Sequence, residues 1–257
     1  MSPAPRPLLT VAARVRKRLA EGDPALVALD FDGTLTEIVD DPAAPRLTAE
    51  RLRVLERIPS PARRLAIVSG RALADVRSRV GIESALYVGN HGLEIEGPGL
   101  AADDAGSAAI ADRVRALLSD LDLPAGTFAE DKRLTATVHT RPREDHGLHE
   151  RVGRGLAPVV ERAGFRLRPG KASWEIRPAE APDKGDALRA LIARVPGARA
   201  RTTLYAGDDV TDEDAFIALP EGITVRVGDD DRGPTAARYR LRSPDETYRF
   251  LEILASD

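Results

Sequence analysis

The chain has 257 residues, and its 38 basic and 41 acidic side chains leave a formal net charge of -3. This near balance provides no overall basic surface, so we do not expect nucleic acid as a partner. The sequence contains no cysteine, which excludes disulfides, thiolate metal ligands and cysteine nucleophiles.

The N-terminal segment predicts a Pro-rich tail followed by a surface helix over Leu8 to Ala20. Its basic cluster follows the short apolar stretch, which is the reverse of signal-peptide order. No apolar run reaches the roughly 20 residues that span a bilayer. We therefore expect a cytoplasmic protein without a membrane partner, and, because no apolar surface stripe stands out, a monomer.

From Leu26 onward, short apolar runs alternate with helical patterns. The runs are bounded by Gly, Asp or Pro and predict strands over 26–31, 65–68, 86–88, 203–206 and 223–227. The patterns between and after them predict helices over 48–58, 72–80, 185–195, 212–219 and 244–255. Such alternation is typical of a parallel sheet with helices on both faces, and so predicts the α/β class.

The middle of the chain has a different character. Small, turn-forming residues over 97–109 indicate a linker. After it we expect helices over 109–120 and 145–163, one half-exposed strand over 127–142, and strands over 165–169 and 172–178. Asp183 is an N-cap candidate where the helical pattern returns. We therefore predict a split core, 1–97 (with the N-terminal tail and helix over 1–24) and 183–257, around an inserted α+β domain over 98–182.

Carboxylates follow two of the predicted strands. In "ALVALDFDGT", Asp30 and Asp32 project to the same side of an extended backbone, and "YAGDDVTDEDAF" adds Asp208, Asp209 and Asp212. Parallel strands bind ligands at their carboxyl ends, and Mg²⁺ prefers a few carboxylates with water and phosphate oxygens. A cation site is therefore predicted, although turn-forming aspartates and acids favoured by a helix dipole would explain parts of the pattern.

Two further elements suit a phosphate group. "LAIVSGR" ends a strand with Ser69 and Gly70, which offer a hydroxyl and a backbone N–H near a helix start. Lys184 stands at the start of its own helix. A turn-forming serine and a solvated lysine would explain either one alone. The order of acids, hydroxyl, lysine and acids, each at a strand end or helix start, favours a phosphate site.

This order of motifs, DFDGT, VSGR, a single Lys and GDDVTDE, resembles the haloacid dehalogenase superfamily of phosphotransferases. The closer resemblance is to the trehalose-6-phosphate phosphatase family, through "LDFDGTLTEIVDDP", "VGNHGLE", "AEDKRLTATVHTR" and "GKASWEIRP", and it spans roughly Ala25 to Asp230. It implies a Rossmann-like parallel-sheet core of the haloacid dehalogenase type with an inserted α+β cap domain. It also implies Mg²⁺-dependent hydrolysis of trehalose 6-phosphate, a small sugar phosphate, through an aspartyl-phosphate.

The resemblance and the chemistry together suggest a role for each motif. Asp30 would be the nucleophile, and Asp32 the general acid and then the general base. Mg²⁺ would be held by the Asp30 carboxylate, the Asp32 carbonyl and Asp208, with Asp209 and Asp212 as auxiliary contacts. The phosphate-binding candidates are Asp30, Thr34, Ser69, Gly70 and Lys184. The substrate-binding candidates are Arg71, Asn90, His91, Glu130, Lys132, His139, Arg141, Lys171, Glu175 and Arg177.

Two aromatic features of the middle segment are interpreted as structural. Trp174 is expected to point away from the strand face of Glu175 and to pack in the core of the inserted domain, with sugar stacking as the alternative. His146 and His149, with Glu150, have the composition of a metal triplet, but on a polar helix we expect them to be solvated.

Three alternatives remain open. Another sugar-phosphate phosphatase, or a phosphomannomutase-like enzyme, would share the core motifs and differ in the inserted domain. A phospho-acceptor signalling domain also groups aspartates, a hydroxyl and a lysine at strand ends, but it would not need residues 98–182. A carbohydrate-binding regulator without catalysis is the third, and intact Asp30 and Asp32 argue against it.

Overall fold

The computed structural model describes residues 4–39, 44–100, 107–140, 147–170, 172–229 and 233–256. The chain forms two compact units. Unit 1 joins Met1–Ala102 with Pro182–Asp257, and unit 2 comprises Asp103–Ala181. Within the described residues, no helix is both long and apolar enough to cross a membrane.

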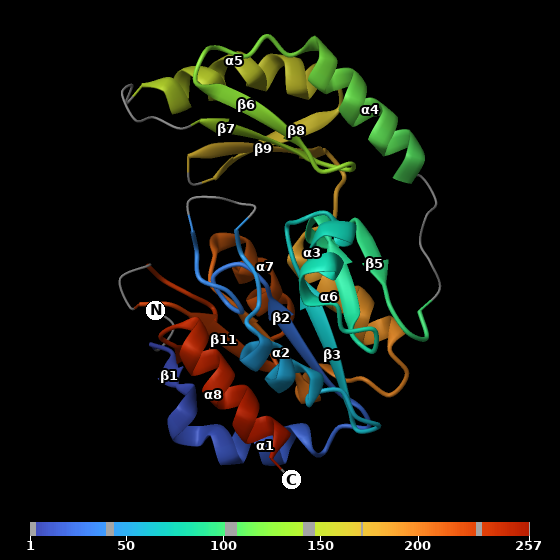
Figure 1. Cartoon of the computed structure of the whole chain (residues 1–257), viewed down its shortest axis with the longest axis vertical. Coiled ribbons are helices and arrows are strands. Elements are labelled where there is room, and N and C mark those ends of the chain that lie inside the picture. Colours follow the sequence, from blue (N-terminus) through green and yellow to red (C-terminus); the bar gives the residue numbers. More distant parts are fainter. Residues whose placement is uncertain are drawn as a thin grey trace. The chain divides into compact units, whose positions relative to one another are not determined.

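Unit 1 contains an eight-stranded sheet in the order β1-β12-β11-β10-β2-β3-β4-β5 (Figure 1). Its neighbouring strands are parallel except for the antiparallel pair β4 and β5. The strands are β1 (Arg6–Pro7), β2 (Ala25–Asp30), β3 (Arg63–Val68), β4 (Leu86–Gly89), β5 (Glu94–Glu96), β10 (Thr203–Gly207), β11 (Ile223–Val227) and β12 (Tyr239–Leu241). The strand order reverses between β2 and β10, and open α/β sheets bind ligands at such a switch point.

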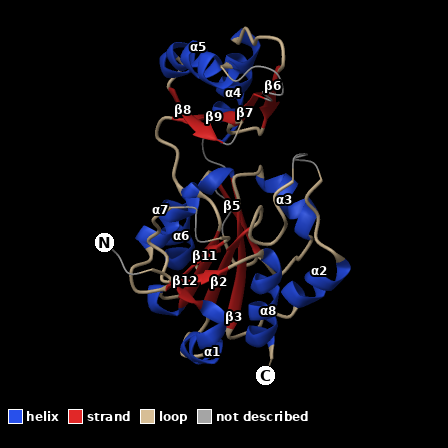
Figure 2. Ribbon diagram, turned by 90° about the vertical axis from the view of Figure 1, so that its left-hand side faces the viewer, coloured by secondary structure: helices blue, strands red, loops and turns tan. Residues whose placement is uncertain are grey.

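Helices cover both faces of this sheet, as Figure 2 shows. One face packs against α1 (Ala12–Leu19), α2 (Ala49–Glu56), α3 (Leu73–Val80) and α8 (Pro244–Ala255), and the other against α6 (Lys184–Arg194) and α7 (Val210–Ala218). Val27 and Leu29 of β2 belong to the first apolar cluster, whereas Leu26 and Ala28 belong to the second. Burial on both faces explains why β2 is a continuous apolar run up to Asp30.

Capping residues fix where two helices begin. Asp183 Oδ1 accepts from the Asp186 N–H at 2.8 Å, and Asp186 Oδ2 accepts from the Asp183 N–H at 3.2 Å. These two reciprocal hydrogen bonds form a capping box, which satisfies backbone N–H groups that the helix itself leaves unpaired. It confirms the predicted start of α6 and makes Lys184 its first residue. In α8, Ser243 is the N-cap and Pro244 the first residue, where its missing N–H costs nothing.

Unit 2 is a four-stranded antiparallel sheet in the order β6-β7-β9-β8, packed on one face against two helices. Its elements are α4 (Ser107–Asp120), β6 (Thr127–Asp131), β7 (Ala136–Thr140), α5 (Leu148–Arg162), β8 (Phe165–Gly170) and β9 (Ser173–Pro178). The prediction of one strand over 127–142 is wrong, because the segment is a hairpin. The chain turns back through Arg133, whose φ is 70°, and the sequence offers no glycine there to indicate the turn.

Trp174 packs in the core of unit 2, as predicted. Its indole N–H donates to the His149 carbonyl at 2.8 Å, and its ring stacks on the His149 imidazole with centroids 4.8 Å apart. Nδ1 of His149 also lies 2.9 Å from the Thr140 hydroxyl. The prediction of a solvated His149 is therefore wrong, and His146 lies outside the described residues.

Candidate active site

Three buried carboxylates and one lysine meet where β2 and β10 end. Asp30 is the last residue of β2, Asp208 directly follows β10, and Asp212 lies in the first turn of α7. Lys184 reaches them from the start of α6. None of the four is more than 4 % exposed. The structure thus brings acids from both sequence clusters together with the lysine.

Lys184 is shared between two of the acids. Its Nζ lies 2.7 Å from Asp30 Oδ1 and 2.7 Å from Asp212 Oδ1. The Asp212 carboxylate also accepts the Tyr205 hydroxyl at Oδ1, 2.7 Å away, and the Asp209 backbone N–H at Oδ2, 2.9 Å away. Asp212 is therefore held by three donors.

Burial and neighbouring charges together set the pKa of each of these groups. It raises the pKa of Asp30 well above its ordinary value, and although Lys184 opposes this, Asp212 and Asp208 add to it. Burial would lower the pKa of Lys184, but Asp212 and Asp30 hold it well above its usual range, so the ammonium stays charged. For Asp212, Lys184 and the hydrogen bonds outweigh burial and lower the pKa. Burial, with Asp212, raises the pKa of Tyr205, so its hydroxyl remains a donor.

The acids outnumber the positive charge that holds them. Asp30, Asp208 and Asp212 can each direct one oxygen to within 4.8 Å of the others. A buried, all-oxygen donor set with a charge deficit suits a hard divalent cation. A carboxylate has about four acceptor positions, and Asp212 already uses three. Asp209 is not in this group, and its side chain is exposed.

Two glycines leave room for the carboxylates. At Gly33, whose φ is 79°, an added Cβ would lie 2.3 Å from the Asp208 carboxyl carbon. At Gly207, a Cβ would lie 2.1 Å from Cγ of Asp212. Because both distances are far inside van der Waals contact, any side chain at these positions would displace an acid of the site.

Asp32 lies outside the buried group and pairs with Arg71. The guanidinium Nε and Nη2 donate to its two carboxylate oxygens, each at 2.7 Å, which is the bidentate geometry that arginine favours. Arg71 also donates to Asp75 at 3.1 Å and lies over the Phe31 ring, 5.7 Å from its centroid. Arg71, expected to contact substrate, thus contacts two carboxylates of unit 1.

The hydroxyl candidates lie at the ends of β2 and β3. Ser69 follows β3, whose last residue is the register partner of Asp30, and it is 1 % exposed. Its Oγ accepts from the Arg71 N–H at 3.1 Å. Thr34, in the turn after β2, is fully buried, and its hydroxyl has no hydrogen-bond partner within the described part of the chain. Buried hydroxyls normally have a hydrogen-bond partner, so the Thr34 hydroxyl is available to donate to a bound group.

Asn90 and His91 support the loop that carries Ser69. Both have positive φ, 47° and 56°, in a turn after β4. The Asn90 N–H donates to the Arg71 carbonyl at 2.7 Å, and the His91 N–H to the Ser69 carbonyl at 3.0 Å. A Cβ on Gly70 would lie 2.5 Å from Nε2 of His91, so the imidazole covers that glycine. Both residues are buried, Asn90 being 0 % and His91 7 % exposed.

The remaining candidates lie in unit 2. The register pairs Glu130 with Thr137 and Thr137 with Glu175, so both glutamates share the sheet face opposite to Trp174. His139 is on the same face, with Nε2 2.8 Å from Glu130 Oε2. Arg177 follows Glu175 at the next position of this face and is 1 % exposed.

One further candidate lies at a strand end, and two lie outside the described residues. Lys132 directly follows β6, and its backbone N–H donates to the Thr135 carbonyl at 3.0 Å. Arg141 and Lys171 lie outside the described residues. Among the described residues, this sheet face of unit 2 carries the carboxylates of Glu130 and Glu175 and the guanidinium of Arg177, groups of the kind that hydrogen-bond sugar hydroxyls.

Sequence reasoning missed Tyr205. This residue sits in the middle of β10, and its hydroxyl bonds to Asp212. A tyrosine inside a strand that is buried on both faces needs a partner for its hydroxyl, and that requirement was a usable signal. The identity of the partner depends on how α7 packs, which the sequence does not give.

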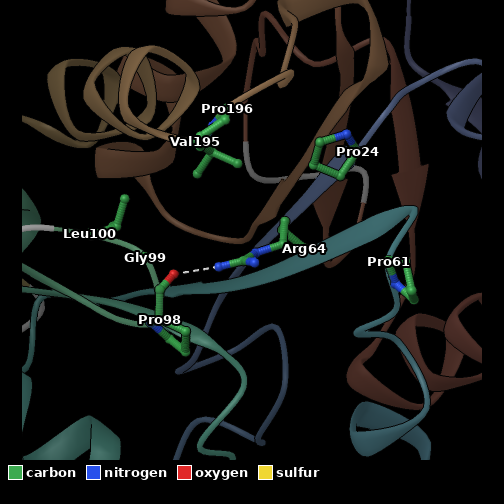
Figure 3. Close-up of a pocket in the computed structure, with 8 residues that line it drawn as sticks. All are labelled: Pro24, Pro61, Arg64, Pro98, Gly99, Leu100, Val195 and Pro196. Atoms are coloured by element: carbon green, nitrogen blue, oxygen red, sulfur yellow. Dashed lines mark hydrogen bonds between the residues drawn. The ribbon is translucent and has the colours of Figure 1, made fainter.

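A hollow of about 280 Å³ lies elsewhere in unit 1 (Figure 3). It is lined by Pro24, Pro61, Arg64, Pro98, Gly99, Leu100, Val195 and Pro196. Arg64 donates to the Pro98 carbonyl at 2.5 Å, and none of these lining residues is acidic. Pro24 precedes β2 whereas Asp30 ends it, so this hollow is at the opposite edge of the sheet and is not part of the site.

Known proteins resemble this chain over most of its length. A model of the trehalose-phosphatase family matches residues 28–245. A trehalose-phosphate phosphatase of Mycobacterium marinum is 39% identical over 244 residues, which cover 90% of this chain and 61% of that protein. This chain therefore spans about three fifths of the length of that curated relative.

Solved structures agree with the sequence comparison. The C-terminal domain of a C. albicans trehalose-6-phosphate phosphatase has a TM-score of 0.76 at 26% identity, covering 99% of each chain. A haloacid dehalogenase-like hydrolase from Bacteroides thetaiotaomicron has a TM-score of 0.59 at 17% identity, covering 90% of this chain and 98% of that one. The second likeness concerns the fold alone.

Proposed function

Because the chain belongs to the trehalose-phosphatase family, with the α/β fold of the haloacid dehalogenase superfamily, we propose that it hydrolyses trehalose 6-phosphate to trehalose and inorganic phosphate. The observation that carries the proposal is the buried group of Asp30, Asp208 and Asp212 around Lys184 at the switch point of the sheet. Such a group suits a phosphoryl group better than a neutral ligand, because it already combines a fixed ammonium with acids that need a cation.

The phosphoryl oxygens are bound by donors at the ends of three elements. These donors are the Lys184 ammonium, the Ser69 and Thr34 hydroxyls and the Gly70 N–H. The unpartnered hydroxyl of Thr34 supports this role, because a phosphoryl oxygen would accept its proton. Phosphoryl transfer depends mainly on alignment and charge neutralisation, which these fixed donors provide.

Asp30 is the nucleophile. Its carboxylate attacks phosphorus, the ester bond to the sugar breaks, and an aspartyl-phosphate forms on Asp30. Asp32 gives a proton to the departing sugar oxygen and then takes one from the water that hydrolyses the aspartyl-phosphate. The side chain of Asp32 is 39% exposed, so it can reach a leaving group once its pairing with Arg71 is exchanged.

The cation that we propose is Mg²⁺, held by the carboxylates of Asp30 and Asp208 and the backbone carbonyl of Asp32. Asp209 and Asp212 would be auxiliary contacts that do not ligate the cation directly. For Asp212, the three donors already on its carboxylate support this assignment. When bound, Mg²⁺ neutralises charge on the phosphoryl group and favours the ionised form of Asp30.

We infer that the inserted domain, 98–182, selects the sugar. The candidates are Glu130, Lys132, His139, Arg141, Lys171, Glu175 and Arg177. The alternating register of unit 2 supports this for the two glutamates and His139, which share one face. Asn90 and His91 are buried, and their backbone N–H groups bond to the carbonyls of Arg71 and Ser69. These contacts suit a role in shaping the Ser69 loop better than a direct contact with the sugar.

We further propose a cytoplasmic monomer whose partner is the sugar phosphate, with neither nucleic acid nor a membrane. The formal net charge of -3 supports the first exclusion.

Phosphate release from a panel of sugar phosphates, with Mg²⁺ and with chelator, tests the proposal. We expect trehalose 6-phosphate to be hydrolysed fastest, and only with Mg²⁺. Faster release from a monosaccharide phosphate would indicate a different phosphatase, and transfer between hydroxyls with little release would indicate a mutase.

A further inference from the structure

Tyr205 differs from the other buried tyrosines in what its hydroxyl contacts. Tyr87, Tyr205 and Tyr248 are each at most 7 % exposed. The hydroxyls of Tyr87 and Tyr248 bond to backbone groups, at 2.9 to 3.2 Å. The Tyr205 hydroxyl instead donates to the Asp212 carboxylate at 2.7 Å. A hydrogen bond to an ionised acceptor is shorter and stronger than one to a neutral group.

The Tyr205 ring is fixed by the same helix that carries its acceptor. It packs edge-to-face on Phe216 of α7, with centroids 5.9 Å apart and an interplanar angle of 71°. Asp212 lies one turn earlier in that helix. β10, which carries Tyr205, is itself paired on both sides, with β2 and β11. The hydroxyl is thus aimed at Asp212 by packing that would persist without the hydrogen bond.

The Tyr205 hydroxyl and the Lys184 ammonium donate to the same oxygen of Asp212. Oδ1 of Asp212 receives both Tyr205 and Lys184, and the ammonium lies 2.7 Å from each acid. Without the Tyr205 hydroxyl, the Lys184 ammonium would be the one remaining donor of these two on Oδ1. Oδ2 would keep the Asp209 N–H, so the carboxylate would be able to pivot about that contact, and the ammonium bonded to Oδ1 would move with it relative to Asp30.

We propose that Tyr205 is a positioning residue: its hydroxyl holds the Asp212 carboxylate so that Lys184 stays bonded to Asp30. Tyr205 touches neither Asp30 nor a phosphoryl group, so it acts only through Asp212 and Lys184. The consequence for phosphate rests on the proposed function, in which Lys184 binds the phosphoryl oxygens. The position of Lys184 itself does not depend on that function.

The small number of lysines allows a direct measurement. The chain contains four, Lys17, Lys132, Lys171 and Lys184. Protein labelled with ¹⁵N-lysine gives at most four ammonium signals, and the buried, doubly bonded Lys184 exchanges slowest with water. Its signal is assigned by its loss in Lys184→Met. We expect Tyr205→Phe to shift this signal and to speed its hydrogen exchange about tenfold, as loss of a hydrogen bond to a charged group predicts.

Tyr87→Phe is the matched control. It also removes one buried hydroxyl from a strand of the same sheet, but that hydroxyl bonds to the Ile82 backbone. It should leave the Lys184 signal in place. A Lys184 signal that Tyr205→Phe leaves unchanged, or that Tyr87→Phe moves equally, would overturn the inference.

Binding of inorganic phosphate to the full chain, measured by calorimetry with Mg²⁺, tests the consequence for the site. We expect about tenfold weaker binding in Tyr205→Phe and no change in Tyr87→Phe. A shifted Lys184 signal with unchanged phosphate affinity would overturn the role at the site. If the wild-type chain neither binds phosphate nor hydrolyses trehalose 6-phosphate, the proposed function fails, while the ammonium signal still decides whether Tyr205 holds Lys184.

Discussion

Replacing Lys184 by methionine removes the ammonium shared by Asp30 and Asp212. Both contacts are 2.7 Å, and the three side chains are between 0% and 6% exposed. Removing one partner of a buried ion pair costs about 3–5 kcal/mol, because the other charge is left unpaired in the interior. The second acid does not add a full second cost, since Asp212 keeps the donors from Tyr205 and Asp209. We expect a loss of about 3–5 kcal/mol in the free energy of unfolding at neutral pH.

The pH dependence of this loss has a definite sign. Without the ammonium, the pKa of Asp30 and that of Asp212 both rise in the folded state. The folded variant then binds protons that the unfolded chain releases, so its stability recovers as the pH falls from neutral toward the unfolded value of about 4. In the wild type, Lys184 opposes such protonation, so the gap between variant and wild type narrows with acid.

Urea unfolding of the metal-free proteins at several pH values measures both effects. Lys17→Met is the control, because Lys17 is exposed on α1 and its loss should change stability by no more than about 0.5 kcal/mol. A cost below about 1 kcal/mol for Lys184→Met would contradict the reasoning, since the usual cost of breaking a buried pair is several times larger. So would a cost that stays constant as the pH falls.

Other substitutions test the remaining parts of the site. Asp30→Asn should reduce phosphate release to the background. Because burial penalises a charge at this position, the substitution should also raise the urea midpoint of the metal-free protein. A less stable variant would contradict the electrostatic argument. Gly207→Ala should weaken phosphate binding in calorimetry and cost about 1–3 kcal/mol, because its Cβ would lie 2.1 Å from Asp212, and an unchanged affinity would mean that Asp212 is not needed in place. His139→Ala should raise KM for trehalose 6-phosphate more than it lowers kcat, because it removes a substrate-binding group of unit 2. A fall in kcat with KM unchanged would instead argue for a role in the chemical step.

The core of unit 1 could be predicted from the sequence because its strands are buried on both faces. β2, β3, β10 and β11 are short, mostly apolar runs bounded by polar residues, Gly or Pro, and β11 was predicted to the residue. Strands β1, β5 and β12 were missed, since two or three residues are too few to form a pattern. The hairpin of β6 and β7 was missed because Arg133 takes a positive φ where a glycine would be expected.

The candidate site was predictable to the extent that it depends on strand ends. Parallel strands bring their carboxyl ends to one edge, so the meeting of Asp30 with Asp208 follows from the topology. The pairing of Asp32 with Arg71 and the bond from Tyr205 to Asp212 depend on rotamers and on how helices pack against the sheet. Neither leaves a periodic trace in the sequence, and so sequence reasoning did not pair Arg71 with Asp32 and omitted Tyr205.

The central claim is that the Asp30 carboxylate forms a covalent bond to phosphorus. Mass spectrometry of protein quenched in acid during the first turnover of trehalose 6-phosphate, with Mg²⁺ present, measures this directly. The account predicts one added phosphoryl group on the peptide that contains Asp30, removed by hydroxylamine and absent in Asp30→Asn. A phosphoryl group on any other residue, or full turnover by Asp30→Asn, would contradict it.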